Sequence, residues 1–127
     1  MKILRFEEIE AWKKGRELTR SIYLKTRSKE FSSDRDLCNQ IHRACVSITS
    51  NIAEGFESQS NPEFVRFLTY SRRSASEVKN QLYIALDERY ITEDEFKQLY
   101  DSASEISKML LGFIRYLRVR NRRSNRV

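Results

Sequence analysis

Apolar residues recur at steps of three and four along most of this chain, which is the period of an amphipathic α-helix. Four stretches carry the pattern, at about residues 6–26, 34–56, 62–88 and 93–120, and each is long enough for about six helical turns or more. The positions that we expect these helices to bury are Ile9, Trp12, Gly15, Leu18 and Ile22; Leu37, Ile41, Ala44, Ile48 and Ile52; Phe64, Phe67, Leu68, Ser71, Ala75, Val78, Leu82 and Ala85; and Phe96, Leu99, Ala103, Ile106, Leu110, Phe113, Ile114 and Leu117.

Short polar links separate the four stretches, and each link carries residues that start or stop helices. The expected boundary residues are Ser32 or Ser33 as the cap of the second helix, Gly55 as its terminator, Asn61 and Pro62 at the start of the third, and Thr92 with Glu95 as a capping box before the fourth. The chain holds only 3 Gly and 1 Pro, too few for a many-turned β fold. The pattern therefore predicts an all-α protein. Short links place successive helices antiparallel, so we expect an antiparallel up-down-up-down four-helix bundle over residues 1–117. We expect a frayed basic tail over residues 118–127.

Positive charge is concentrated at the C-terminal end. The net charge is +6; residues 115–127 contain six arginines, and the 18 basic residues before them balance 18 acidic ones. No Asp or Glu follows Glu105. A neutral body with a cationic end is typical of proteins that bind a polyanion, most often nucleic acid, although a tail that only aids solubility would have the same composition.

The nucleic-acid-binding residues that we predict form two groups. They are Arg115, Arg118, Arg120, Arg122, Arg123 and Arg126 in the tail, and Arg66, Arg72, Arg73 and Lys79 on the exposed side of the third helix. On the interpretation that no aromatic residues interleave with the tail arginines, we expect contacts mainly to phosphates and little sequence preference.

A metal centre is the first alternative chemistry. Cys38, His42 and Cys45 share one face of the second helix, and thiolate and imidazole are good zinc ligands. However, three ligands on one straight helix spread over about 10 Å, wider than one ion can bridge, and the sequence holds no other His or Cys. We therefore predict no metal and no cofactor, with the two cysteines reduced and packed as small apolar residues.

Catalysis is the second alternative. His42 is the only histidine, so it would have to supply any histidine general base, and no Gly-rich phosphate loop or nucleophile elbow occurs. Glu54 and Glu77 could be imagined as paired carboxylates, but nothing in the sequence places a substrate between them. We expect a protein that is not an enzyme. Without a signal peptide or an apolar run near the roughly 18 residues that cross a membrane, we also expect a cytoplasmic location.

Polar residues run beside the apolar stripe in the stretch "SITSNIAEG", residues 47–55. The set comprises Ser47, Ser50, Asn51 and Glu54 on the second helix and Ser71, Ser74 and Glu77 on the third. Small side chains let two helices approach closely, and their hydroxyl and amide groups can satisfy a buried carboxylate. We interpret the set as a polar seam that fixes the register of the two helices; a seam between subunits and a binding groove are the alternatives.

Longer motifs carry a resemblance to a known family. They are an early "F-x-x-I-x-x-W" (Phe6, Ile9, Trp12), then "QIHRACVSITSNIAEG", "NPEFVRFLTYSRRSASEVKNQLYIA" and "EISKMLLGFIRYL". Over almost all of residues 6–117 the chain resembles the four-helix-bundle family of proteins encoded by intervening sequences in bacterial large-subunit ribosomal RNA genes. Relatives of this family include the accessory variability protein, Avd, of diversity-generating retroelements.

The resemblance implies the bundle fold and a homopentameric ring. Avd-like members are basic, bind RNA and associate with a reverse transcriptase, whereas many other members have no assigned role, and "SNIAEG" has no known catalytic role. Two hypotheses follow. The chain is a non-enzymatic RNA-binding scaffold, accessory to a retroelement reverse transcriptase, or it is a protein–protein interaction module with no nucleic-acid role.

Overall fold

The structure, a computed structural model, describes residues 2–124, with side chains through Arg120. Its elements in chain order are the 3-10 helix η1 (Phe6–Glu8) and the α-helices α1 (Glu10–Lys25), α2 (Lys29–Ser33), α3 (Arg35–Phe56), α4 (Asn61–Asp87) and α5 (Glu93–Ser124). No strand occurs within these described residues, and the all-α prediction is confirmed.

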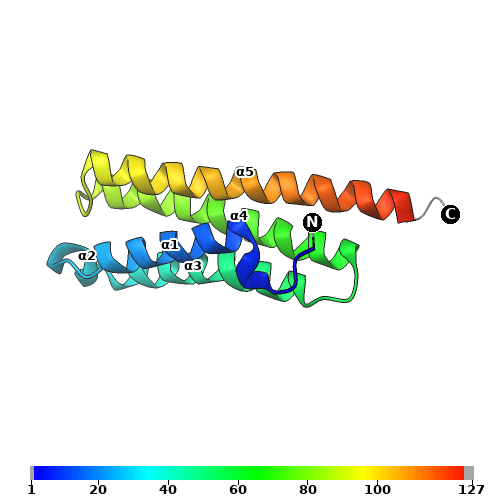
Figure 1. The fold of residues 1–127 in the computed structure, drawn as a ribbon. Coiled ribbons are helices and arrows are strands. Elements are labelled where there is room, and N and C mark those ends of the chain that lie inside the picture. Colours follow the sequence, from blue (N-terminus) through cyan, green and yellow to red (C-terminus); the bar gives the residue numbers. More distant parts are fainter. Residues whose placement is uncertain (1, 125–127) are drawn as a thin grey trace.

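The four long helices lie along a common direction, and each runs opposite to the long helix before it (Figure 1). Helix α3 packs against α1 and α4, while α5 packs against α4 and α1. The contacts therefore close a cycle of four neighbours around one core. We call these packed helices the helical body.

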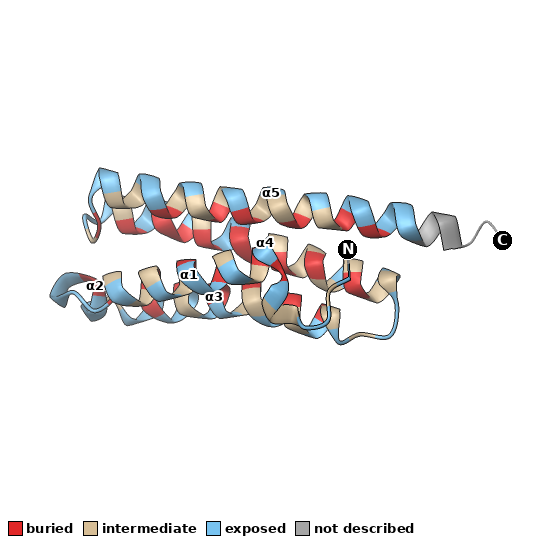
Figure 2. Cartoon of the chain, in the orientation of Figure 1, coloured by how far each residue is buried: buried red, intermediate tan, exposed pale blue. Residues whose placement is uncertain are grey.

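The apolar stripes predicted from the sequence face the core of the helical body. Ile41, Ile48 and Leu68, for example, are fully buried, and Figure 2 shows buried segments on each of the long helices. Four aromatic members of the stripes are half-buried at the rim instead: Trp12, Phe67, Phe96 and Phe113. Burying an aliphatic side chain of this size contributes on the order of 1.5–3 kcal/mol, so the core supplies most of the stabilising free energy.

The link between α1 and α3 differs from the prediction, because residues 29–33 form the separate helix α2. Ser32 and Ser33 do not cap α3, since both lie inside α2, where their hydroxyls donate to carbonyls of the same helix. Asp34 caps α3 instead: its Oδ1 accepts the Leu37 N–H at 3.1 Å.

The starts of α4 and α5 lie close to the predicted positions. Ser60, rather than Asn61, caps α4 by accepting the Glu63 N–H at 3.3 Å, and Asn61 is the first helical residue. The predicted capping box of α5 is confirmed: Thr92 Oγ1 accepts the Glu95 N–H at 3.1 Å, and Glu95 Oε1 accepts the Thr92 N–H at 2.9 Å.

Gly55 does not terminate α3, which continues to Phe56. The glycine instead allows α3 and α4 to approach each other. A Cβ at this position would lie 2.8 Å from Phe64 Cδ1 and 2.9 Å from Phe67 Cβ, closer than carbon atoms pack. The prediction was wrong because close helix packing and helix termination both favour glycine.

The turn from α4 to α5 ends α4 in a Schellman motif. Arg89 has a φ of 62°, in the left-handed region. Its N–H donates to the Leu86 carbonyl at 3.0 Å, and the Tyr90 N–H donates to the Ala85 carbonyl at 2.9 Å. Glycine is the usual residue in this position, so an arginine here carries a steric cost of roughly 1–2 kcal/mol.

Helix α5 continues to Ser124 and does not fray near Arg120 as we expected. Its last turns extend past the link between α3 and α4 (Figure 1). Leu117 is the last described residue that is buried, so position 117 marks the end of core contact and not the end of the helix. Arginine is a good helix former, which favours this continuation beyond the helical body.

Candidate nucleic-acid interface

The C-terminal half of α5 is the most cationic element of the chain. Arg115, Arg118 and Arg120 are exposed on it. Within the part of the chain that the structure describes, neither Arg115 nor Arg118 forms an ion pair with a carboxylate. Arg122 and Arg123 belong to the same helix, but their side chains lie outside the described residues, as does Arg126 entirely. The described end of α5 therefore presents guanidinium groups to solvent, and no carboxylate among the described residues neutralises those of Arg115 and Arg118.

Tyr116 lies among these arginines, so the interpretation that no aromatic residue interleaves with them was wrong. Its side chain is 47% exposed. Arg120 Nη1 donates to the Tyr116 hydroxyl at 2.9 Å, and the guanidinium carbon lies 5.6 Å from the centre of the ring. This geometry is a cation–π contact that holds the ring and the charge together.

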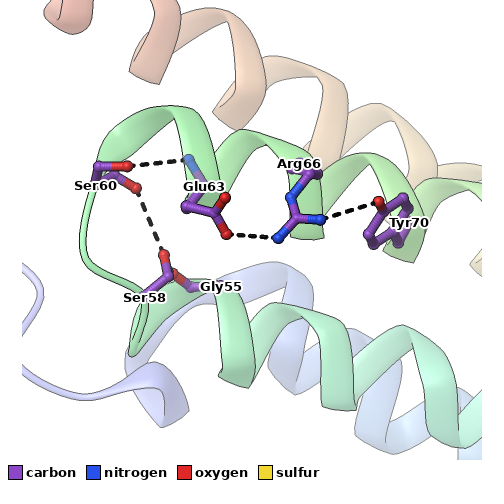
Figure 3. Close-up of polar contacts among 6 residues, drawn as sticks. All are labelled: Gly55, Ser58, Ser60, Glu63, Arg66 and Tyr70. Carbon is purple, nitrogen blue, oxygen red and sulfur yellow. Dashed lines mark hydrogen bonds and ion pairs between the residues drawn. The ribbon is translucent and has the colours of Figure 1, made fainter.

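The second predicted group, on α4, divides into two pairs. Arg66 and Arg73 are exposed on α4, as predicted. Arg66 forms an ion pair with Glu63 at 2.7 Å and a long hydrogen bond to the Tyr70 hydroxyl (Figure 3). Arg73 lies over the same Tyr70 ring, at 5.5 Å from its centre. The Glu63 carboxylate reduces the charge that this part of α4 can offer to a phosphate.

Arg72 and Lys79 are half-buried, and their prediction as exposed residues was wrong. The two positions are seven residues apart, which is about two helical turns, so both lie on the edge of α4 that borders α5. Arg72 Nε donates to the Ser107 carbonyl at 3.2 Å, and Lys79 Nζ lies 4.9 Å from the centre of the Tyr100 ring. Both cations join α4 to α5.

The polar seam is narrower than predicted. Four of its residues meet at the contact of α3 and α4. The Ser74 hydroxyl donates to Ser47 Oγ at 3.0 Å, and Asn51 Nδ2 donates to the Ser47 carbonyl and hydroxyl oxygens at 2.8 and 2.9 Å. On the same face, the buried Ser71 hydroxyl donates to the Ile48 carbonyl at 2.7 Å.

The other three predicted members, Ser50, Glu54 and Glu77, are exposed. They follow the three- and four-residue spacing but lie at the outer edge of their helices, where water solvates them. The seam therefore holds no buried carboxylate. It is a set of neutral hydroxyl and amide groups, which cost less to bury than a charge.

Comparison with known proteins assigns the chain to a family. A family model described as "23S rRNA-intervening sequence protein" matches residues 7–112, from η1 into α5. The chain belongs to this family. It is also similar to the crystal structure of a protein of unknown function from the S23 ribosomal protein family of Bacteroides thetaiotaomicron. The two are 26% identical with a TM-score of 0.75, over 82% of this chain and 97% of the other. A search of curated proteins found no match.

The match to the intervening-sequence family ends at residue 112, before Arg115. The family assignment therefore rests on the helical body and on the seam, which lies within it. The arginines and Tyr116 at the end of α5 lie outside the matched range. They are features of this chain that the assignment neither requires nor explains.

The three residues considered as zinc ligands, Cys38, His42 and Cys45, each have their own packing contacts. The Cys38 thiol donates to the Phe31 carbonyl at 3.2 Å, and burial raises the pKa of the Cys45 thiol to about 12. His42 stacks on Tyr23, with ring centres 3.9 Å apart. Among the described residues, no three His, Cys, Asp or Glu side chains form a group that could hold a metal ion.

His42 also contacts α1: its Nε2 lies 2.8 Å from the Thr26 hydroxyl. Burial lowers the pKa of His42, which favours the neutral imidazole. The side chain therefore joins α3 to the end of α1. Among residues 2–124, no helix combines the length and the apolar character needed to cross a membrane.

Proposed function

We propose that this protein is a non-enzymatic, cytoplasmic RNA-binding scaffold, and that its RNA contacts lie along the C-terminal half of α5. The observation that carries the proposal is the exposure of Arg115 and Arg118 without carboxylate partners on a stretch of chain, 106–127, that has no acidic residue. The description of the family, which names an intervening sequence of 23S rRNA, supports RNA as the polyanion.

Guanidinium groups bind phosphates in pairs of parallel hydrogen bonds, and each neutralised phosphate releases bound counterions. Because α5 continues beyond the helical body, its last turns can approach a nucleic acid without a clash with α1 or α3. Glu63 beside Arg66 makes α4 a weaker contact. We therefore assign α5 the main role and α4 the minor one.

The proposal includes assembly of four-helix bundles into a homopentameric ring, which the family resemblance implies. Several apolar side chains are exposed on the single chain, among them Leu24, Val46 and Ile84, and contacts between copies would cover such residues. A ring would also present several α5 ends to one RNA, and linked sites bind more tightly than single ones. The native mass in solution tests this part.

RNA affinity measured at several salt concentrations tests the main part. The variant Arg115→Gln/Arg118→Gln removes two charges from α5, and Arg16→Gln/Arg20→Gln removes two exposed charges from α1 as the matched control. We expect the α5 variant to bind a structured RNA more weakly. The slope of log affinity against log salt should become shallower by about 0.7–0.9 for each phosphate that the variant no longer neutralises.

The α1 control should keep both the affinity and the slope. Equal weakening in both variants would contradict a localised interface, because only the net charge would then matter. Absence of RNA binding by the unsubstituted protein would favour the alternative, a protein–protein interaction module. We do not extend the proposal to a reverse transcriptase, because neither the family description nor the similar structure points to one.

A further inference from the structure

A hollow of about 330 Å³ opens where the N-terminal segment, the link between α3 and α4 and residues 113–120 of α5 meet. We call it the end hollow. Residues far apart in the sequence line it, including Lys2, Ser58 and Arg120. Part of the link is seen in Figure 3, where Ser58 and Ser60 lie between the end of α3 and the start of α4.

One wall of the end hollow is aromatic. Phe64 of α4 and Phe113 of α5 meet edge to face, with ring centres 5.1 Å apart, and Tyr116 lies one turn beyond Phe113. The Phe113 and Tyr116 ring centres are 6.3 Å apart. Because Tyr116 is 47% exposed, a flat aromatic ligand can reach its ring.

The rest of the lining is polar and cationic. Ser58, Gln59 and Asn61 offer hydroxyl and amide groups, and Lys2 and Arg120 provide positive charge. None of the described residues that line the end hollow is acidic. Such a lining suits a ligand with a flat ring, hydrogen-bonding edges and a negative charge.

A neighbouring hollow shows the contrast. It shares Ile3 and Tyr116 with the end hollow, has a volume of about 400 Å³ and is mostly apolar, with Ile9 and Met109 in its lining. Lys2 borders both hollows, but only this one also has the carboxylates Glu8 and Glu10 in its lining. Their carboxylates would repel a phosphate, so this hollow does not suit the same ligand.

We propose that the end hollow binds one unpaired nucleotide of the RNA, with the base stacked on Tyr116 and the phosphate held by Arg120 and Lys2. The inference rests on the proposed function and adds to it the class of RNA element that is recognised. A volume of about 330 Å³ is at the lower end of the range for small-ligand pockets and admits a single nucleotide, not a duplex. Bases that are unpaired can leave the stack and pack on aromatic side chains, which bases in an A-form helix cannot do.

The position of Arg120 supports this assignment. Its hydrogen bond to the Tyr116 hydroxyl keeps the guanidinium beside the ring that would stack on the base. A base and its own phosphate are separated by only one sugar, so a nucleotide needs a ring and a cation at this short spacing. Arg115 and Arg118 do not line the end hollow and remain available for neighbouring phosphates.

The test compares single-stranded and duplex RNA of equal length. Tyr116→Leu keeps an apolar side chain but removes the stacking surface, and Tyr116→Phe keeps the ring. The matched control is Tyr83→Leu, since Tyr83 is similarly exposed, at 49%, on α4. We expect Tyr116→Leu to weaken binding of a single-stranded oligoadenylate by about 5- to 150-fold, with duplex binding unchanged. Tyr83→Leu should bind both RNAs as the unsubstituted protein does. Tyr116→Phe keeps the ring but loses the hydroxyl that positions Arg120, so its affinity for the oligoadenylate should lie between those of the unsubstituted protein and Tyr116→Leu.

A second measurement does not depend on RNA affinity. In an NMR titration, adenosine monophosphate should shift the backbone amide resonances of Ser58 and Tyr116, and inorganic phosphate alone should shift them far less. Unchanged single-strand binding by Tyr116→Leu, together with no shift from the nucleotide, would overturn the end-hollow proposal. A changed native mass of Tyr116→Leu would also overturn it, because the hollow would then be a contact between copies.

The two proposals fail separately. Weaker binding by Arg115→Gln/Arg118→Gln with normal binding by Tyr116→Leu would retain the α5 interface and reject the nucleotide site. Nucleotide shifts at the end hollow without RNA binding by the unsubstituted protein would retain the site and reject the proposed function. The absence of both nucleotide shifts and RNA binding would reject both proposals.

Discussion

The Ser71 hydroxyl of α4 donates a 2.7 Å hydrogen bond to the Ile48 carbonyl of α3, and both residues are fully buried. Ile48 lies inside α3, where its carbonyl accepts a backbone hydrogen bond of that helix. The Ser71 hydroxyl of α4 adds a second hydrogen bond to the same oxygen. The bond fixes the distance and the register between α3 and α4 at the point where only a small side chain fits.

Ser71→Ala should lower the free energy of unfolding by about 1 kcal/mol, because it removes a buried hydrogen bond. Ser71→Leu should lower it by about 1–3 kcal/mol through overpacking. Urea denaturation measures both, with the exposed Ser76→Ala as a control that should change stability by less than about 0.5 kcal/mol. A Ser71→Leu protein as stable as the original would contradict the close approach of the two helices.

Gly55→Ala and Gly112→Ala should change stability in opposite directions. Both glycines lie inside helices, where alanine is favoured by roughly 0.5–1 kcal/mol. At Gly55 the new Cβ would clash with Phe64 and Phe67, and the strain of about 1–3 kcal/mol exceeds that gain. At the exposed Gly112 no atom lies within 4 Å of the new Cβ, so the gain should be realised in full. Thermal unfolding of the two variants gives the signs, and a stabilised Gly55→Ala would refute the packing role of this glycine.

Arg89→Gly should raise the melting temperature. Glycine relieves a left-handed strain of about 1–2 kcal/mol, and the added freedom of the unfolded chain costs only about 0.4–1 kcal/mol. Glu88→Gly is the control, since Glu88 has a φ of −83° and carries no such strain. That variant should melt at a lower temperature. The same direction of change in both variants would contradict the special conformation of Arg89.

Stability should fall as the pH drops through the range near 6. Burial lowers the pKa of His42 in the folded protein, so the unfolded chain binds the proton more tightly. The stabilising contribution is therefore complete above the unfolded pKa of about 6.5 and is lost as the pH falls toward the folded pKa. His42 is the only histidine, so His42→Gln should remove this slope in urea denaturation at a pH of about 5.5 and of about 7.5, on either side of the unfolded value. An unchanged slope would assign the effect to other groups.

The sequence predicted the core well because burial follows the helical period. Every aliphatic residue of the four predicted stripes is buried, and only large rings such as Trp12 and Phe113 extend to the rim. The period fixes the angle of a residue about its own helix. It does not say which helix lies beside that position, so Arg72 and Lys79 were predicted to be exposed although α5 partly covers them.

The end hollow could not have been predicted from local patterns. Lys2, Ser58 and Arg120 come from three segments that meet only once the helices have packed. The signal that the sequence did contain was Tyr116 between Arg115 and Arg118, an aromatic residue among cations. The boundary errors at Ser32, Ser33 and Gly55 have a related cause, because each residue type suits more than one local role.

The shared location of Lys2 and Arg120 has a practical consequence for anyone who purifies this protein. Both side chains line the end hollow, so a bulky label attached at position 2 or position 120 would stand beside the proposed nucleotide site and shield it. The turn between α4 and α5, at the opposite tip of the molecule (Figure 1), is the place where a label would leave that region uncovered.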